Sequence, residues 1–176
     1  MTRSVGNLAL AHATTVVALA LAAAAAVGIL SPGPAPTDAA LTRQFQNHRA
    51  DFEIVREMAQ TDRYVTRIAP TFVMLRGASP PPPEQVRGAI SDARLERYRD
   101  LFRRIGDRDG IDNGEGYVFF AVYDAGLAGS SGVSKGIAWS ADQPPNIVKS
   151  LDGRIVGPLQ GWRQIAPNWY IELDYD

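Results

Sequence analysis

The chain has 176 residues, of which 45% are hydrophobic and 21% charged, a composition typical of a globular domain. Its 18 basic and 19 acidic residues give a formal net charge of −1, which argues against a nucleic-acid binder and against a polybasic membrane-surface module. Cysteine is absent, which excludes disulfides, thiolate metal sites and cysteine nucleophiles.

The first 30 residues form an apolar N-terminal segment. Residues 7–30 carry no charge, and a helix over residues 8–30 would span roughly 34 Å at about 1.5 Å per residue, enough to cross a bilayer. Arg3 precedes the segment and places the N-terminus in the cytoplasm. Two alternatives stay open: an uncleaved signal anchor, or a signal peptide cleaved after an Ala-x-Ala site. We therefore expect a single-pass cell-membrane protein whose C-terminal domain lies outside the cytoplasm or, after cleavage, a secreted or periplasmic protein.

A proline-rich stretch, residues 31–37, predicts a stiff linker between this segment and an extracytoplasmic domain, residues 38–176. Thr37 or Asp38 can cap a helix that continues to about Thr61. Its predicted apolar face recurs at spacings of four and three and comprises Leu41, Phe45, His48, Phe52, Val55 and Ala59.

The next elements are less regular. Residues 64–75 predict an extended segment that Pro70 interrupts, and residues 77–83, with four consecutive prolines, an exposed polyproline-like loop. A second amphipathic helix is expected from Ser91 to Ile105, with Gly106 at its end.

The remaining third of the chain has the pattern of strands. Residues 117–123 and 133–140 predict a hairpin, residues 147–151 one helical turn, and residues 162–165 a short strand. The strict alternation of residues 169–175 predicts a half-buried strand. One face carries Trp169, Ile171, Leu173 and Tyr175, and the other Tyr170, Glu172 and Asp174.

Helices that precede strands indicate an α+β domain. We expect an N-terminal transmembrane or signal helix followed by two helices packed on a three- to five-stranded antiparallel sheet. The aromatic residues of the C-terminal half are expected mainly in the core, with an exposed patch for a protein or glycan partner as the alternative.

The loop over residues 126–136 is the strongest candidate for a ligand site. Backbone amides of a Gly/Ser loop can cradle an anion, and a lysine supplies positive charge. The candidate residues are Ser130, Ser131, Ser134 and Lys135. The glycine spacing does not match a phosphate-binding P-loop, and a flexible hairpin connection without a ligand is the favoured explanation of the segment.

Other patterns are weaker. Residues 107–115 resemble a calcium loop, but the ligand positions do not match an EF-hand, and a turn rich in Asp, Asn and Gly explains them better. A looser calcium site would use Asp107, Asp109, Asp112 and Glu115. His48 is the only histidine of the domain, which excludes multi-histidine zinc sites. Carboxylates for acid–base catalysis would have to come from Asp51, Glu53, Asp124 and Glu172. We predict no metal, no cofactor and no catalytic residue from any of these patterns.

Residues 134–170 carry one resemblance, in Ser134-Lys-Gly-Ile-Ala-Trp139, Ser150-Leu-Asp152, Ile165 and Asn168-Trp-Tyr-Ile171. These motifs resemble short exported or membrane-anchored bacterial proteins with no assigned activity, which implies a cell-envelope address and supplies no site residue. The first functional hypothesis is an accessory or interaction domain that binds the membrane through its N-terminal helix and an envelope protein partner through its sheet or loops. The alternative is a small-ligand or anion-binding domain, with a hydrolase as its enzymatic variant, that uses the loop of residues 126–136.

Overall fold

The computed structural model describes residues 33–77, 82–125, 132–153 and 160–175. The chain divides into two compact units, residues 1–34 and 35–176, and the first is described only at its last two residues. The predicted N-terminal helix therefore lies outside the described residues. Among the helices that are described, none is long and apolar enough to span a membrane.

Helix α2 (Asp38–Thr61) is the long helix expected after the linker. Thr37 caps it, because its hydroxyl accepts a hydrogen bond from the amide of Ala40 at 3.2 Å. The predicted apolar face is confirmed except at His48, which is only partly buried and has non-helical dihedral angles, φ −122° and ψ 21°. The helix is kinked at this residue. Its buried apolar residues are Leu41, Phe45, Phe52, Val55, Met58 and Ala59.

Helix α4 (Asp92–Ile105) is the second predicted helix. Ser91 caps its first turn, and Gly106 ends it in the left-handed conformation, φ +76°. A short helix that the sequence did not predict, α3 (Pro83–Ala89), lies between α2 and α4. Pro83 stands at its first position, where the missing amide proton costs no helical hydrogen bond.

The strands of the described residues form one seven-stranded antiparallel sheet with the order β2-β1-β3-β4-β5-β7-β6. Its strands are β1 (Val65–Ile68), β2 (Val73–Leu75), β3 (Ile111–Gly114), β4 (Tyr117–Asp124), β5 (Val133–Ser140), β6 (Gln160–Ala166) and β7 (Trp169–Tyr175). The predicted hairpin is β4–β5, and the predicted final strand is β7. The expected helical turn at residues 147–151 is wrong, since Ile147 forms an isolated parallel bridge to Trp162 of β6.

The prediction of two helices on a three- to five-stranded sheet is therefore wrong, because the described residues contain three helices and seven strands. The extended segment around Pro70 is a hairpin, β1–β2, which adds two strands at the edge of the sheet. Strand β3 has the turn-forming sequence Asp-Asn-Gly at residues 112–114. It pairs with β1 because Gly110, at φ +82°, lets the two backbones approach closely. A Cβ atom on residue 110 would lie only 2.0 Å from the carbonyl oxygen of Ile68.

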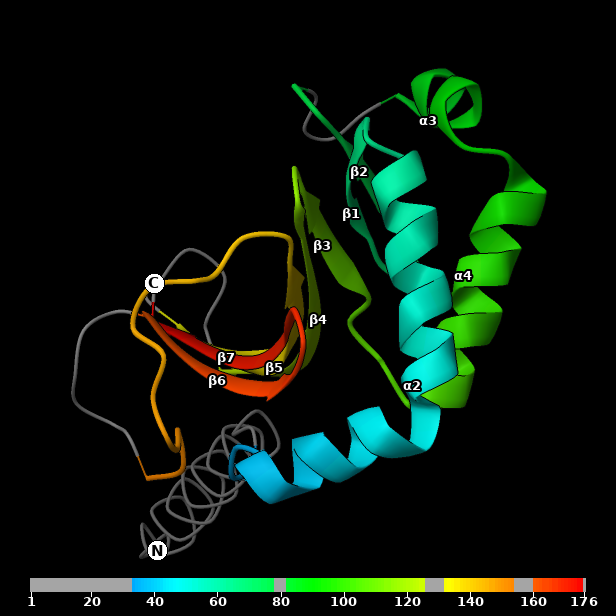
Figure 1. Ribbon diagram of the computed structural model, residues 1–176. Helices are drawn as coiled ribbons and strands as arrows, with labels where there is room; N and C mark the ends of the chain where they lie inside the picture. The colour runs from blue at the N-terminus through cyan, green and yellow to red at the C-terminus, as the bar shows by residue number, and fades with distance from the viewer. Residues whose placement is uncertain (1–32, 78–81, 126–131, 154–159, 176) are drawn as a thin grey trace, which may run out of the picture. The chain divides into compact units, whose positions relative to one another are not determined.

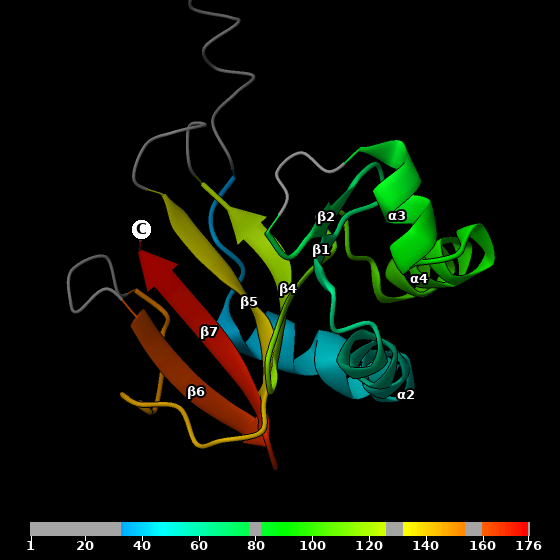
Figure 2. The same ribbon diagram turned by 90° about the horizontal axis from the view of Figure 1, so that it is seen from above.

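The sheet is bent, and α2 bends with it. In Figure 1 the first half of α2 runs beneath β5, β7 and β6, and its second half runs beside β1 and β3 with α4 next to it. Figure 2 shows β6, β7, β5 and β4 side by side, with α2 on their far side. Both long helices therefore cover the outer face of the bend, and the inner face carries side chains of the sheet together with the loop after β5, whose residues 142–145 line a cavity there.

The main core fills the space between the helices and the outer face. Its centre is aromatic: the ring of Phe45 lies 4.9 Å from that of Trp169, and the ring of Phe52 lies 4.8 Å from that of Phe120. The Trp169 indole N–H donates to Glu53 Oε1 at 2.9 Å, so this buried polar group is satisfied. Burial of each such large side chain contributes roughly 1.5–3 kcal/mol to stability.

A buried ionic cluster attaches the beginning of α2 to the sheet. Asp38 and Lys135 are 2% and 3% exposed, and Lys135 Nζ lies 2.9 Å from Asp38 Oδ1 and 3.0 Å from Asp152 Oδ1. Asp38 Oδ2 also accepts the amide of Leu151 at 2.8 Å and lies 3.4 Å from Arg163 of β6. Burial alone would raise the pKa of Asp38, but these hydrogen bonds and the lysine charge lower it below its ordinary value.

Replacing Lys135 by methionine should leave a buried aspartate without its closest cation. We expect Lys135→Met to lower the free energy of unfolding by about 3 kcal/mol, measured by urea denaturation at pH 7. Lys149, the other lysine, is exposed, and Lys149→Met is the matched control with an expected change within about 0.5 kcal/mol. Equal effects of the two substitutions would show that the cluster does not hold α2 to the sheet.

Candidate functional site

The structure separates the two residues of the predicted anion site that it describes. Ser134 and Lys135 are neighbours in β5, so their side chains point to opposite faces of the sheet. Lys135 belongs to the buried cluster with Asp38 and Asp152, whereas Ser134 lines a cavity on the inner face. Ser130 and Ser131 lie outside the described residues, so the role of the loop in ligand binding stays a prediction.

The inner face of the bend carries a groove made of two adjoining cavities, of about 250 and 530 Å³. They share Tyr117 of β4 with Glu172 and Asp174 of β7. Strand register explains the arrangement, because Glu172 lies opposite Gly136 of β5 on one side and Trp162 of β6 on the other. The predicted alternation of β7 is thus confirmed, but its polar face is not a solvated one.

Aromatic side chains form the floor of this groove. The ring of Trp162 lies edge-on to those of Tyr117 and Tyr170, at 6.0 and 5.9 Å between centroids. Phe119 packs over Gly136, where a Cβ atom would lie 2.7 Å from the phenyl ring. Together with small residues, these rings form a second apolar cluster that lowers the local polarity: Phe119, Ala121, Ala138, Trp162 and Tyr170.

Glu172 is the central polar residue of the groove, and it is 2% exposed. Its Oε2 accepts a hydrogen bond from the Tyr117 hydroxyl, and its Oε1 accepts one from Gln160 Nε2 at 2.6 Å. Burial raises the pKa of Glu172 most, the two hydrogen bonds lower it, and the charge of Asp174 raises it further, to about 7. Near neutral pH this carboxyl group can therefore exchange a proton or, once ionised, hold a cation.

The rim of the smaller cavity is acidic. Arg67 of β1 faces Asp112 of β3 at 3.3 Å, and burial raises the pKa of Asp112, although Arg67 opposes the rise. Among the described residues, the lining of this cavity includes four carboxyl groups and one guanidinium: Asp112, Asp124, Glu172 and Asp174, with Arg67. The groove thus has the sign of charge opposite to that expected for an anion site.

Trp162 adds a hydrogen-bond donor. It is 5% exposed and lines the larger cavity, and its indole nitrogen has no hydrogen-bond partner in the described part of the chain. An orphaned buried N–H costs about 1–3 kcal/mol, so an acceptor atom in the groove would stabilise this arrangement.

Two of the four carboxylates considered for acid–base chemistry meet in the groove, Asp124 and Glu172. The others lie on α2, where Asp51 pairs with Arg104 and Glu53 pairs with Arg56. The aromatic floor and the contributions of Tyr117 and Gln160 were not predicted from the sequence. The available signal was the alternation of β7, whose polar face carries two carboxylates; the expectation that this strand is half-buried is wrong, since both of its faces are buried over residues 169–173.

The turn predicted for residues 107–115 is confirmed only at residues 107–110, where Asp107 Oδ1 accepts the amides of Asp109 and Gly110 at 2.9 and 2.8 Å. It is wrong at residues 111–114, which form strand β3. Within the described ranges, no three His, Asp or Glu side chains are placed to hold a metal ion. The expected core role of the aromatic residues is confirmed for Trp162, Trp169 and Tyr170, which are 5% exposed or less. The large hydrophobic residues that are exposed in the described part are Tyr64, Phe72 and Ile147.

Comparison of the chain with protein-family models, with curated proteins and with solved structures found no match. The predicted resemblance to exported bacterial proteins therefore stays an expectation. The chemistry of the groove has to be inferred from its own residues.

The raised pKa of Glu172 predicts a specific pH dependence of stability. A carboxyl group whose pKa rises from 4.5 to about 7 on folding binds its proton more tightly in the folded state, so stability is lost as the pH rises through this interval. Glu172→Gln removes this loss. The variant should therefore gain stability relative to the natural chain between pH 5 and pH 8, by up to about 3 kcal/mol in urea unfolding.

Asp107, whose pKa burial also raises to about 7, acts in the same direction, so the variant should keep part of the slope. Glu84→Gln, at an exposed position of α3, is the control. Its free energy of unfolding should stay within about 0.5 kcal/mol of that of the natural chain at both pH 5 and pH 8. A Glu172→Gln curve parallel to that of the natural chain would show that this carboxyl group is not buried as described.

Proposed function

We propose that residues 35–175 form an extracytoplasmic binding domain that takes a small organic cation in the inner groove, with Glu172 as its main counter-ion. The observation that carries the proposal is a carboxyl group 2% exposed, held by two donors over an aromatic floor and bordered by two cavities. Small-molecule sites have this composition: mostly apolar walls, with a few fixed polar groups and a titratable residue of perturbed pKa.

The charge of the groove supports a cationic ligand. The carboxylates of Asp112, Asp124 and Glu172 repel one another across the smaller cavity, where Arg67 pairs with Asp112. A bound ammonium group would remove this repulsion, and the neighbouring rings of Tyr117 and Trp162 would add cation–π attraction.

The donors of the groove support a ligand that also carries an oxygen acceptor. The indole N–H of Trp162 needs an acceptor, and the hydroxyl of Ser134 lines the adjoining cavity. An amino alcohol or a similar hydroxylated cation has both groups within a few ångströms. Cavities of about 250 and 530 Å³ are of the size that such small ligands occupy.

The cell-envelope address is part of the proposal and has separate support. It comes from the uncharged apolar stretch of residues 7–30, the preceding Arg3 and the proline-rich linker. An envelope protein partner stays a further possibility for the exposed surface, and the membrane is the partner of the N-terminal segment.

Choline tests the ligand class, because its charge does not depend on pH and 3,3-dimethyl-1-butanol is its neutral isostere. Titration calorimetry of the full chain at pH 8 should detect binding of choline or of the related cations ethanolamine and spermidine. It should detect no binding of the neutral alcohol. Glu172→Gln should weaken cation binding at least tenfold, and Glu84→Gln should not. Affinity should fall as the pH drops below about 7, because protonation neutralises Glu172.

Equal binding of choline and its neutral isostere would reject the role of charge in the groove. Absence of binding for all three cations at millimolar concentration would reject the proposed ligand class.

Mass spectrometry of the protein from fractionated cells tests the address. If the segment is an anchor, we expect the chain in the membrane fraction, beginning at residue 1 or 2. If it is a signal peptide, we expect the chain in a soluble envelope fraction without its first 20 to 30 residues, on the order of one signal-peptide length. An intact chain in the cytosolic fraction, free of membrane, would contradict export.

A further inference from the structure

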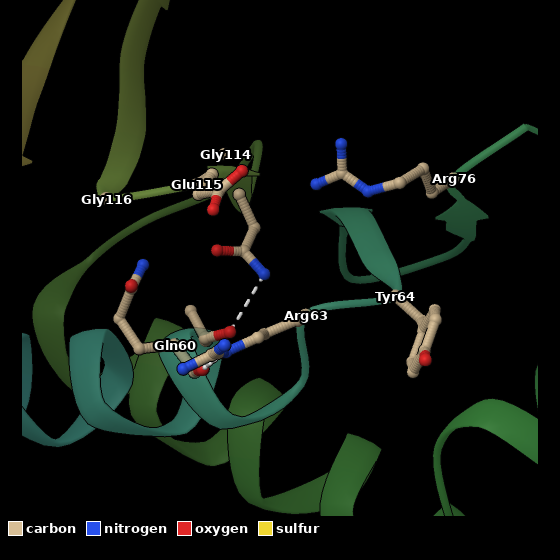
Figure 3. Close-up of a pocket in the computed structure, with 9 residues that line it drawn as sticks. Gln60, Arg63, Tyr64, Arg76, Gly114, Glu115 and Gly116 are labelled. Carbon is tan, nitrogen blue, oxygen red and sulfur yellow. Dashed lines mark hydrogen bonds between the residues drawn. The ribbon is translucent and has the colours of Figure 1, made fainter.

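A separate cavity, of about 540 Å³, lies at the C-terminal end of α2 and shares no lining residue with the inner groove. Its other walls are the two residues just before β1, the residue just after β2, and the end of β3 with the turn to β4 (Figure 3). The cation proposal uses none of these residues.

Asn113 supplies a fixed acceptor to this cavity. The residue is 5% exposed, and its Nδ2 donates to the carbonyl oxygens of Ala59 and Val65 at 2.9 Å each and of Asp62 at 3.3 Å. Because only the NH₂ group can donate to carbonyls, these contacts fix the orientation of the amide. Its buried Oδ1 has no hydrogen-bond partner within the described ranges, and Asn113 lines the cavity.

Gln60 supplies a donor. Its Nε2 is buried and likewise has no partner among the residues that the structure describes. In Figure 3 the Gln60 side chain rises from α2 toward the turn that carries Glu115 and Gly116. An orphaned donor and an orphaned acceptor at one cavity indicate a ligand that offers both groups in return.

Positive charge at the rim adds a third requirement. Arg63 and Arg76 face the cavity against one carboxylate, Glu115, a net charge of +1. Figure 3 shows the Arg76 guanidinium reaching from β2 toward the turn at Gly114 and Glu115. Within the described parts of the chain this guanidinium makes no hydrogen bond or ion pair, so its planar fork is open to a carboxylate.

We propose that this cavity binds the carboxyl-terminal residues of a peptide. The terminal carboxylate pairs with Arg76. The N–H and C=O of the preceding residue, which point to the same side of an extended peptide, pair with Asn113 Oδ1 and Gln60 Nε2. This ligand is the anionic end of a peptide, whereas the groove is proposed to bind a small cation. The two sites share no residue.

A fluorescein-labelled Ala-Ala-Ala peptide with a free carboxylate, and the same peptide with a terminal carboxamide, test the proposal by fluorescence anisotropy with the full chain. We expect the acid to bind at least tenfold more tightly than the amide. Arg76→Gln should abolish this preference, and Gln60→Leu should weaken the acid peptide several-fold. Arg43→Gln, at an exposed position in the first half of α2, is the matched control and should change neither affinity.

Glu172→Gln separates this site from the groove, because it should leave peptide binding unchanged. Equal binding of the two peptides, an unchanged preference in Arg76→Gln, or no binding at millimolar peptide would overturn the proposal. Displacement of the peptide by an equal concentration of acetate would also overturn it, since the cavity would then recognise a carboxylate alone.

Discussion

The ion pair between Asp38 and Lys135 is the contact on which the rest of the fold depends. It fixes the first turn of α2 to β5. Asp38 also contacts Leu151, which precedes β6 in the chain, and Arg163 within β6. A carboxylate at a helix N-terminus is stabilised by the backbone dipoles, which adds to the lysine charge. With its start fixed here and its kink at His48, α2 covers the outer face of the sheet along both arms of the bend.

The alternation of side chains along each strand then divides the chemistry of the domain between the two faces. The outer face receives large apolar side chains and the Lys135 cluster, and the inner face receives Glu172, Asp174 and the Trp162 floor. A buried carboxyl group over aromatic rings is costly when ionised, so Glu172 keeps its proton up to about pH 7. The same position that costs stability at high pH provides the counter-ion of the proposed cation site.

Two proposed sites of opposite charge coexist on a chain whose formal net charge is only −1. The groove has an acidic rim, whereas the cavity at the end of α2 has two arginines against one glutamate. Their separation is a consequence of topology, since neighbouring residues of β3 point to opposite faces of the sheet: Asp112 lines the groove, and Asn113 lines the cavity at the end of α2. A domain of this design can bind a small cation and a peptide end independently.

The sequence by itself determined the elements whose pattern is local. The apolar faces of α2 and α4, the β4–β5 hairpin and the alternation of β7 all follow from spacing along a single helix or strand. Only the tertiary structure decided the number of strands, because β3 is made of turn-forming residues and pairs with β1 through the close approach at Gly110. The sites were decided in the same way. Lys135 pairs with Asp38, which lies 97 positions earlier in the chain, and Glu172 accepts a hydrogen bond from Tyr117, which lies 55 positions earlier. Such contacts depend on register across several strands, and no local pattern encodes that register.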